Sequence, residues 1–180
     1  MDLSDRQLAD SSYRQFVIDL RIQPPRSPRV RLGPFIILPR CLDKCRAHLA
    51  GLAGEYVFDS MLDRFLFDFK GVTGDEFKAK VVGGCSDEEM LEWLGQAGLP
   101  RTEAEILAWG ADVLRYSLAY DPTGILHATP KRVAYLTEQC VKYGLDPLTT
   151  PVLERLELDD LRSFEESVQP VAAAKPDSAP

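Results

Sequence analysis

The chain contains no long apolar run, and this absence excludes the class of membrane-spanning helical proteins. About eighteen consecutive apolar residues are needed to cross a bilayer, and no stretch of the 180 residues approaches that length. The first ten residues, MDLSDRQLAD, have no apolar segment after a basic start, so no secretory signal is expected. We therefore expect a cytoplasmic protein that does not associate with a membrane.

Cysteine and histidine are scarce, and the motifs of common cofactor and catalytic sites are missing. The four cysteines do not follow the spacing of a disulfide scaffold, so they are expected to be free, buried thiols. The sequence has no phosphate loop, dinucleotide fingerprint or metalloprotease motif. The two histidines belong to no recognisable catalytic pattern. No cofactor is predicted, and an enzyme is not the favoured class.

The net charge of −7 argues against nucleic-acid binding, which depends on the neutralisation of phosphates. Positive charge is nevertheless concentrated in one segment. From Arg21 to His48 there are seven basic residues and one acidic residue, Asp43, so the local charge is +6. This asymmetry indicates either a surface for an anionic partner or arginines that pair with the protein's own acidic helices.

Helix signals recur along the chain, and no stretch alternates apolar and polar residues as a strand would. Three capping boxes begin at Thr73, Ser86 and Thr102, each with a glutamate three residues later. Thr129-Pro130 is a further helix start. The helix after Thr102 is expected to be the longest, over residues 103–119. Together these signals predict a single all-α domain of six or seven helices.

The predicted domain covers residues 19–166. Residues 1–18 are expected to form a weakly held helix, because their apolar residues are sparse. Residues 19–34 contain several prolines, which disfavour a helix, and are predicted to be an extended arm that displays arginines. Residues 167–180 are rich in alanine and proline and are predicted to be disordered.

A helix with two different faces is predicted to begin near Leu38. At 100° per residue its apolar residues form one stripe that would face the core: Leu38, Cys41, Leu42, Cys45, Leu49 and Leu52. Arg40, Asp43 and Lys44 fall on the opposite face, with His48 at the boundary. The simplest expectation for that face is exposure to solvent, with neighbouring charges pairing along the helix.

Two kinds of chemistry are conceivable on this helix. Cys41, Cys45 and His48 share one side and are weak candidates for metal ligands. A structural zinc site needs four ligands, however, usually in pairs, so no metal is predicted and buried thiols are the favoured interpretation. Alternatively, Asp43 and His48, with Glu55 after the helix, could be acid–base groups of a small enzyme, with Arg40 and Lys44 binding an anionic substrate.

The arm also has two interpretations. Its arginines (Arg21, Arg26, Arg29 and Arg31) could bind phosphates, although the segment lacks the aromatic residues of a single-strand nucleic-acid site. Alternatively, the arm lies across acidic helices and its guanidinium groups bind carboxylates. The second interpretation is favoured.

Several short motifs make the chain similar to a bacterial family of unknown function. They are Asp19-Leu20-Arg21, the segment from Pro24 to Arg29, Leu32-Gly33, Leu38-Pro39-Arg40, Leu42-Asp43-Lys44, Arg46-Ala47, Gly54-Glu55-Tyr56 and Phe69-Lys70-Gly71. The resemblance covers residues 15–100 best, and it implies no known activity.

The favoured function is therefore non-catalytic binding of a partner protein or a small anionic ligand. The binding surface is predicted to be formed by the arm and by the segment from Arg40 to Tyr56. The candidate residues are Arg21, Arg26, Arg29, Arg40, Asp43, Lys44, His48, Glu55 and Tyr56.

Overall fold

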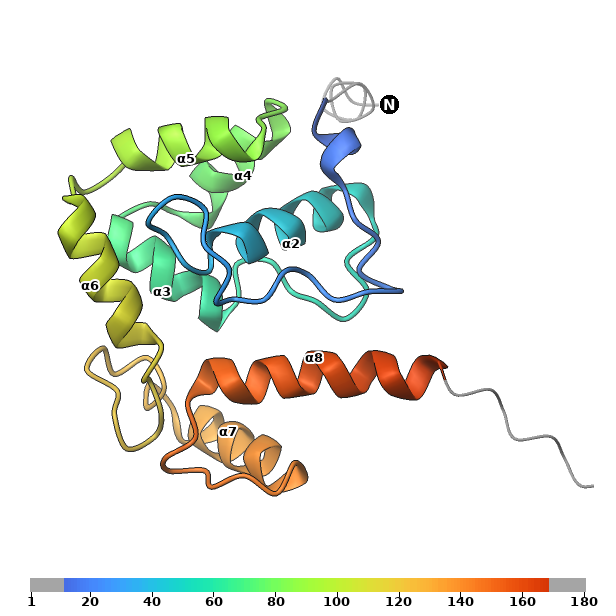
Figure 1. Ribbon diagram of the computed structural model, residues 1–180, viewed down its shortest axis with the longest axis vertical. Coiled ribbons are helices and arrows are strands. Elements are labelled where there is room, and N and C mark those ends of the chain that lie inside the picture. Colours follow the sequence, from blue (N-terminus) through green and yellow to red (C-terminus); the bar gives the residue numbers. More distant parts are fainter. Residues whose placement is uncertain (1–11, 169–180) are drawn as a thin grey trace, which may run out of the picture.

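The computed structural model describes residues 12–168, and in this range it contains seven α-helices and no β-strand (Figure 1). The prediction of an all-α fold is confirmed. None of these helices is long and apolar enough to cross a bilayer. The helices are α2 (Leu38–Ala50), α3 (Met61–Lys70), α4 (Gly74–Val82), α5 (Asp87–Gln96), α6 (Glu103–Val113), α7 (Pro130–Lys142) and α8 (Val152–Val168), preceded by a 3₁₀ turn, η1 (Ser12–Phe16).

The local start signals place the helices as predicted. At Thr73, Ser86 and Thr102 the hydroxyl accepts a hydrogen bond from the backbone N–H three residues on, and the glutamate there closes the capping box. Ser60 and Asp63 form a fourth box at the start of α3. The helix after Thr102 is shorter than predicted, however, and α8 is the longest, with 17 residues.

The early end of α6 has a cause in the tertiary structure. The segment after Val113 bonds to the loop before α8: Tyr116 accepts a hydrogen bond from the N–H of Val152, and Ala119 donates to the carbonyl of Leu148. The Tyr116 side chain is buried in the core. A helix continued to residue 119 would lose these contacts.

The two predicted terminal segments are described only in part. Of residues 1–18, the first eleven lie outside the described residues, and Ser12–Phe16 is the 3₁₀ turn. Of residues 167–180, the last twelve lie outside the described residues, and the first two end α8.

Helix α2 lies between α4 and the arm (Figure 1), and most of its length is buried. Every residue from Leu38 to Ala47 is buried, including Arg40, Asp43 and Lys44, which are 1–3% exposed. The prediction that these three residues lie on a solvent-exposed face is wrong. Residues 19–34 lie across α2 on one side, α3 to α5 pack on another, and α8 closes the fold against Arg40.

Candidate functional site

The charged residues of α2 are neutralised by partners from other elements: three aspartates pair with its cations, and Arg26 of the arm pairs with its own aspartate, Asp43. Between α2 and the arm, Arg26 donates to both carboxylate oxygens of Asp43 (Nε–Oδ2 2.9 Å, Nη2–Oδ1 2.8 Å). Its Nη1 also donates to Asp87 of α5, at 2.5 Å. Arg46 donates to the other oxygen of Asp87, at 2.6 Å. An arginine of the arm therefore binds carboxylates of two helices, α2 and α5, in line with the favoured interpretation of the arm.

A second group joins α2 to α8. Arg40 makes a two-pronged pair with Asp160 (Nη1–Oδ2 2.7 Å, Nη2–Oδ1 3.1 Å), and the hydroxyl of Tyr56 donates to the same carboxylate at 2.8 Å. Burial raises the pKa of Tyr56 well above its usual value, and the negative charge of Asp160 raises it further. Tyr56 therefore stays protonated and serves as a donor.

A third group surrounds the ammonium of Lys44, which has three acceptors. They are a carboxylate oxygen of Asp63 at 2.8 Å, the hydroxyl of Ser60 at 2.9 Å and the carbonyl of Val57 at 3.1 Å. The thiol of Cys41 donates to the other oxygen of Asp63, at 3.0 Å. All three hydrogens of the ammonium are thus used within the fold.

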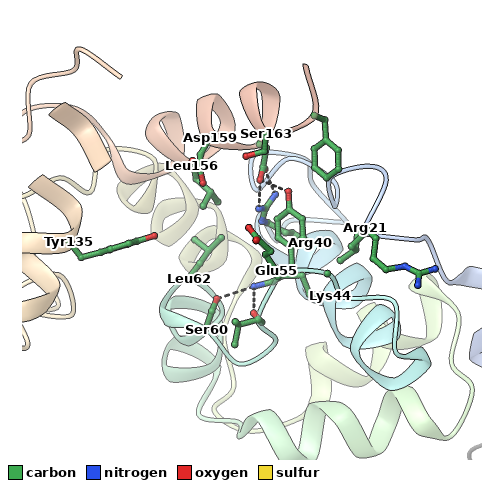
Figure 2. A pocket seen from close by; sticks show the side chains of 16 residues that line it. Arg21, Arg40, Lys44, Glu55, Ser60, Leu62, Tyr135, Leu156, Asp159 and Ser163 are labelled. Atoms are coloured by element: carbon green, nitrogen blue, oxygen red, sulfur yellow. Dashed lines mark hydrogen bonds and ion pairs between the residues drawn. The ribbon is translucent and has the colours of Figure 1, made fainter. Parts of the chain in front are cut away.

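A cavity of about 790 Å³ lies between α2, residues 54–60 and α8; we call it the α2–α8 cavity (Figure 2). Its wall contains five of the nine candidate residues predicted from the sequence: Arg21, Arg40, Lys44, Glu55 and Tyr56. The wall is completed by Leu20, Gly54, Val57, Ser60 and Leu62, and by residues of α7 and α8: Tyr135, Leu156, Asp159, Asp160, Ser163 and Phe164.

The other four candidates do not line this cavity. Arg26 and Asp43 belong to the closed chain of ion pairs under the arm. Arg29 is bound to Glu157 of α8, at 2.7 Å. The His48 side chain is exposed at the end of α2, where its ring lies 6.3 Å from that of Phe58. Asp43, His48 and Glu55 are therefore not brought to one place, as an acid–base site would require.

The two candidate thiol ligands are in the core. Cys41 and Cys45 are fully buried, and burial raises the pKa of both thiols, that of Cys45 to about 12. Both are therefore protonated at neutral pH, whereas a metal ligand must be a thiolate. Within residues 12–168 no three His, Cys, Asp or Glu side chains are arranged to hold a metal ion.

The charged side chains of the cavity wall differ in whether they are free to bind a ligand. Arg40 and Lys44 are buried and already paired, and the guanidinium of Arg21 is bound to Asp19 at 2.7 Å and points away from the cavity (Figure 2). The carboxylate of Glu55 is exposed and has no hydrogen bond or ion pair with any described residue. The cavity therefore offers a ligand a free acceptor rather than a free cation.

The comparison with protein families agrees with the resemblance noted in the sequence. A family described as "Domain of unknown function (DUF5069)" matches residues 22–161. The chain belongs to this family. The match extends from the arm to α8, and it therefore includes most of the cavity wall. No curated protein matches the chain in sequence.

Sequence reasoning missed the acidic half of this DUF5069 site. Asp63 had a detectable signal, since Ser60 and Asp63 have the spacing of a capping box, and Asp63 indeed accepts the N–H of Ser60 at 3.0 Å. Asp160 had no such signal, because it lies 120 residues from its partner Arg40. The contribution of Tyr135 in α7 was likewise invisible in the local pattern.

Proposed function

We propose that this DUF5069 protein is a non-catalytic binding protein whose α2–α8 cavity takes a small organic molecule with a cationic, hydrogen-bond-donating group. The observation that carries the proposal is the contrast between Glu55, whose carboxylate is unpaired among the described residues, and the cations of the wall, which are paired. A volume of about 790 Å³ is in the range of small-molecule sites.

Electrostatics favours a cationic ligand over the anionic ligand predicted from the sequence. An anion bound at Arg40 or Lys44 would have to displace Asp160 or Asp63, which are held there by the fold. The displaced carboxylate would then be buried without a partner, at a cost of several kcal/mol. An ammonium next to Glu55 gains a partner and displaces nothing.

Aromatic side chains support the same class of ligand. Tyr135 reaches from α7 toward the cavity (Figure 2) and is half exposed, and Phe164 lies on α8 in the same wall. Aromatic faces attract cations, by about 0.5–2 kcal/mol, and provide apolar surface for the rest of the ligand. A pocket of this kind suits a small molecule better than a protein partner.

Catalysis receives less support. The acid–base groups of the enzyme alternative are separated, since of Asp43, His48 and Glu55 only Glu55 lines the cavity. In addition, Ser60 lies beside Lys44, but this lysine is ion-paired with Asp63, so it is not available as a general base for the hydroxyl.

Thermal denaturation with spermidine, putrescine and argininamide, against acetate and citrate, tests the proposal. We expect at least one of the amines to raise the Tm and the carboxylates to have no effect beyond ionic strength. Val57→Trp should reduce the amine effect by narrowing the cavity, whereas Val141→Trp should not, because Val141 is equally exposed (64% against 65%) but lies elsewhere. Stabilisation by citrate alone would contradict the proposed charge, and an amine effect that survives Val57→Trp would contradict the proposed site.

The variant Glu55→Gln tests the contribution of the carboxylate alone, because it removes the charge and leaves the other residues of the cavity wall in place. The amine effect should fall several-fold, because the ligand loses its charged partner. Glu92→Gln is the matched control, since Glu92 is also exposed but lies on α5, away from the cavity. Equal amine effects in the two variants would show that Glu55 does not bind the ligand.

A further inference from the structure

One buried cation in the described part of the chain differs from all the others. Arg40, Lys44 and Arg46 each have a carboxylate partner, and Lys70 donates to the carbonyl of Leu99. Arg155 of α8 is 3% exposed, yet its guanidinium makes no hydrogen bond or ion pair with any described residue, and its Nε and Nη1 are completely buried.

An unpaired buried guanidinium is costly, because arginine is charged at every physiological pH and has five donors to satisfy. Lysine could lose its charge when buried, but arginine cannot. A leucine or methionine at position 155 would fill the same volume at no electrostatic cost, as Leu42 and Met90 do at other positions of this core. A ligand that binds the guanidinium would therefore explain why an arginine occupies this buried position.

The location of Arg155 on α8 adds a second electropositive feature. It lies in the first turn of a 17-residue helix, where the helix dipole disfavours cations and favours anions. The N–H of Val152 is used by Tyr116, but those of Leu153 and Glu154 have no acceptor among the described residues. Side chains of a helix generally lean toward its N-terminus, so a guanidinium in the first turn is suited to reach an anion bound at these donors.

We propose that Arg155 and the first turn of α8 form a binding site for a small oxyanion, such as phosphate, sulfate or a carboxylate group. The backbone donors at the start of α8 and the guanidinium fork are the two elements from which oxyanion sites are built in proteins.

This site is separate from the α2–α8 cavity. Arg155 does not line that cavity; it lies on the α7 side of α8, close enough to Cys140 for its charge to act on that thiol. The proposed oxyanion site and the proposed amine site can therefore be tested, and rejected, independently of each other. An anion site at Arg155 also differs in position from the one predicted from the sequence, which was formed by the arm and the segment from Arg40 to Tyr56.

The test is the Tm as a function of inorganic phosphate, with sodium chloride keeping the ionic strength constant. Phosphate at a concentration about 100-fold above its Kd is expected to raise the Tm of the unaltered protein by roughly 3 °C or more. The rise should be lost in Arg155→Met and kept in Arg64→Met, which removes an exposed arginine of α3, and in Glu55→Gln. Sulfate and acetate in parallel titrations distinguish a preference for tetrahedral anions from one for carboxylates.

Either of two results would overturn the proposal: no rise in the unaltered protein beyond that of chloride, or an equal rise in Arg155→Met. If Arg155→Met does not fold, Arg155→Lys keeps the charge but loses the fork, and it should need several-fold more phosphate for half of the effect. Phosphorus NMR provides a readout without denaturation, because bound phosphate broadens the resonance; an unbroadened line with the unaltered protein would also reject the site.

Discussion

At the residue scale, the main feature of this protein is that its charged side chains are used as core residues. Asp43, Asp63, Asp87 and Asp160 neutralise the cations of α2 and Arg26 of the arm. Each pair joins two elements, so its geometry helps to fix where those elements dock. Because removing one partner leaves the other buried and charged, such pairs should be sensitive to single substitutions.

Asp63→Asn should lower the free energy of unfolding by about 3 kcal/mol, because Lys44 then lacks a counter-charge in a fully buried site. Urea denaturation measures the loss. Asp68→Asn on the same helix is the control, since Asp68 is exposed and should change stability by less than about 0.5 kcal/mol. Similar values for the two variants would mean that the buried pair contributes nothing specific.

Asp87 should make stability depend on acid pH. Burial alone would raise the pKa of its carboxyl, but hydrogen bonds from Arg26 and Arg46 outweigh burial and hold the pKa below the ordinary value of 3.8. A lowered pKa in the folded state stabilises the protein above the unfolded-state pKa, and this contribution is lost as the pH falls through the folded-state pKa. A Tm series from pH 6 to pH 2.5 should therefore fall less steeply below about pH 4 in Asp87→Asn than in the unaltered protein; parallel curves would contradict the assignment.

At the element scale, the arm and α8, which lie far apart in sequence, complete the burial of α2 beside η1, α3 and α4. The carbonyl of Pro28 accepts the N–H of Ile37 at 2.9 Å, just before α2, where Ile37 has the unusual φ of 67°. Glu157 of α8 binds Ser27 and Arg29 of the arm. The arm is thus fixed between α2 and α8.

Two arginines of the arm should differ in their contribution. Arg26→Ala should cost about 3 kcal/mol, because the side chain of Asp43 is only 4% exposed and loses its partner. Arg29→Ala should cost less than about 1 kcal/mol, because both members of its pair with Glu157 are at least 33% exposed. Chemical denaturation and hydrogen exchange of the α2 amides measure the difference, and equal costs would argue against the arm as a cover for α2.

At the scale of the whole molecule, local signals in the sequence predicted the helices, and long-range pairing decided what surrounds them. The boxes at Thr73, Ser86 and Thr102 are complete within four residues, so the sequence alone reveals them. The burial of Arg40 depends on Asp160, and the shape of the cavity depends on how α7 and α8 dock. Charge patterning along one helix contains no information about such partners, which is why the polar side of α2 was predicted to be exposed.

For the candidate site too, the sequence predicted the region but not which of its charges is free. The motif Gly54-Glu55-Tyr56 and the charges Arg40 and Lys44 indicated the correct region, and the structure brings them to one cavity. Which of these charges remains free could not be predicted, because that depends on Asp63 and Asp160 reaching them from other elements.

The central claim is that the α2–α8 cavity binds a cationic small molecule through Glu55. The most direct measurement is a titration of ¹⁵N-labelled protein with spermidine and argininamide, followed by amide chemical shifts, with citrate as the anionic comparison. An amine should cause saturable shifts at residues 54–57 and 156–164, and these shifts should be strongly reduced in Glu55→Gln. Shifts at these residues with citrate but with neither amine would contradict the claim.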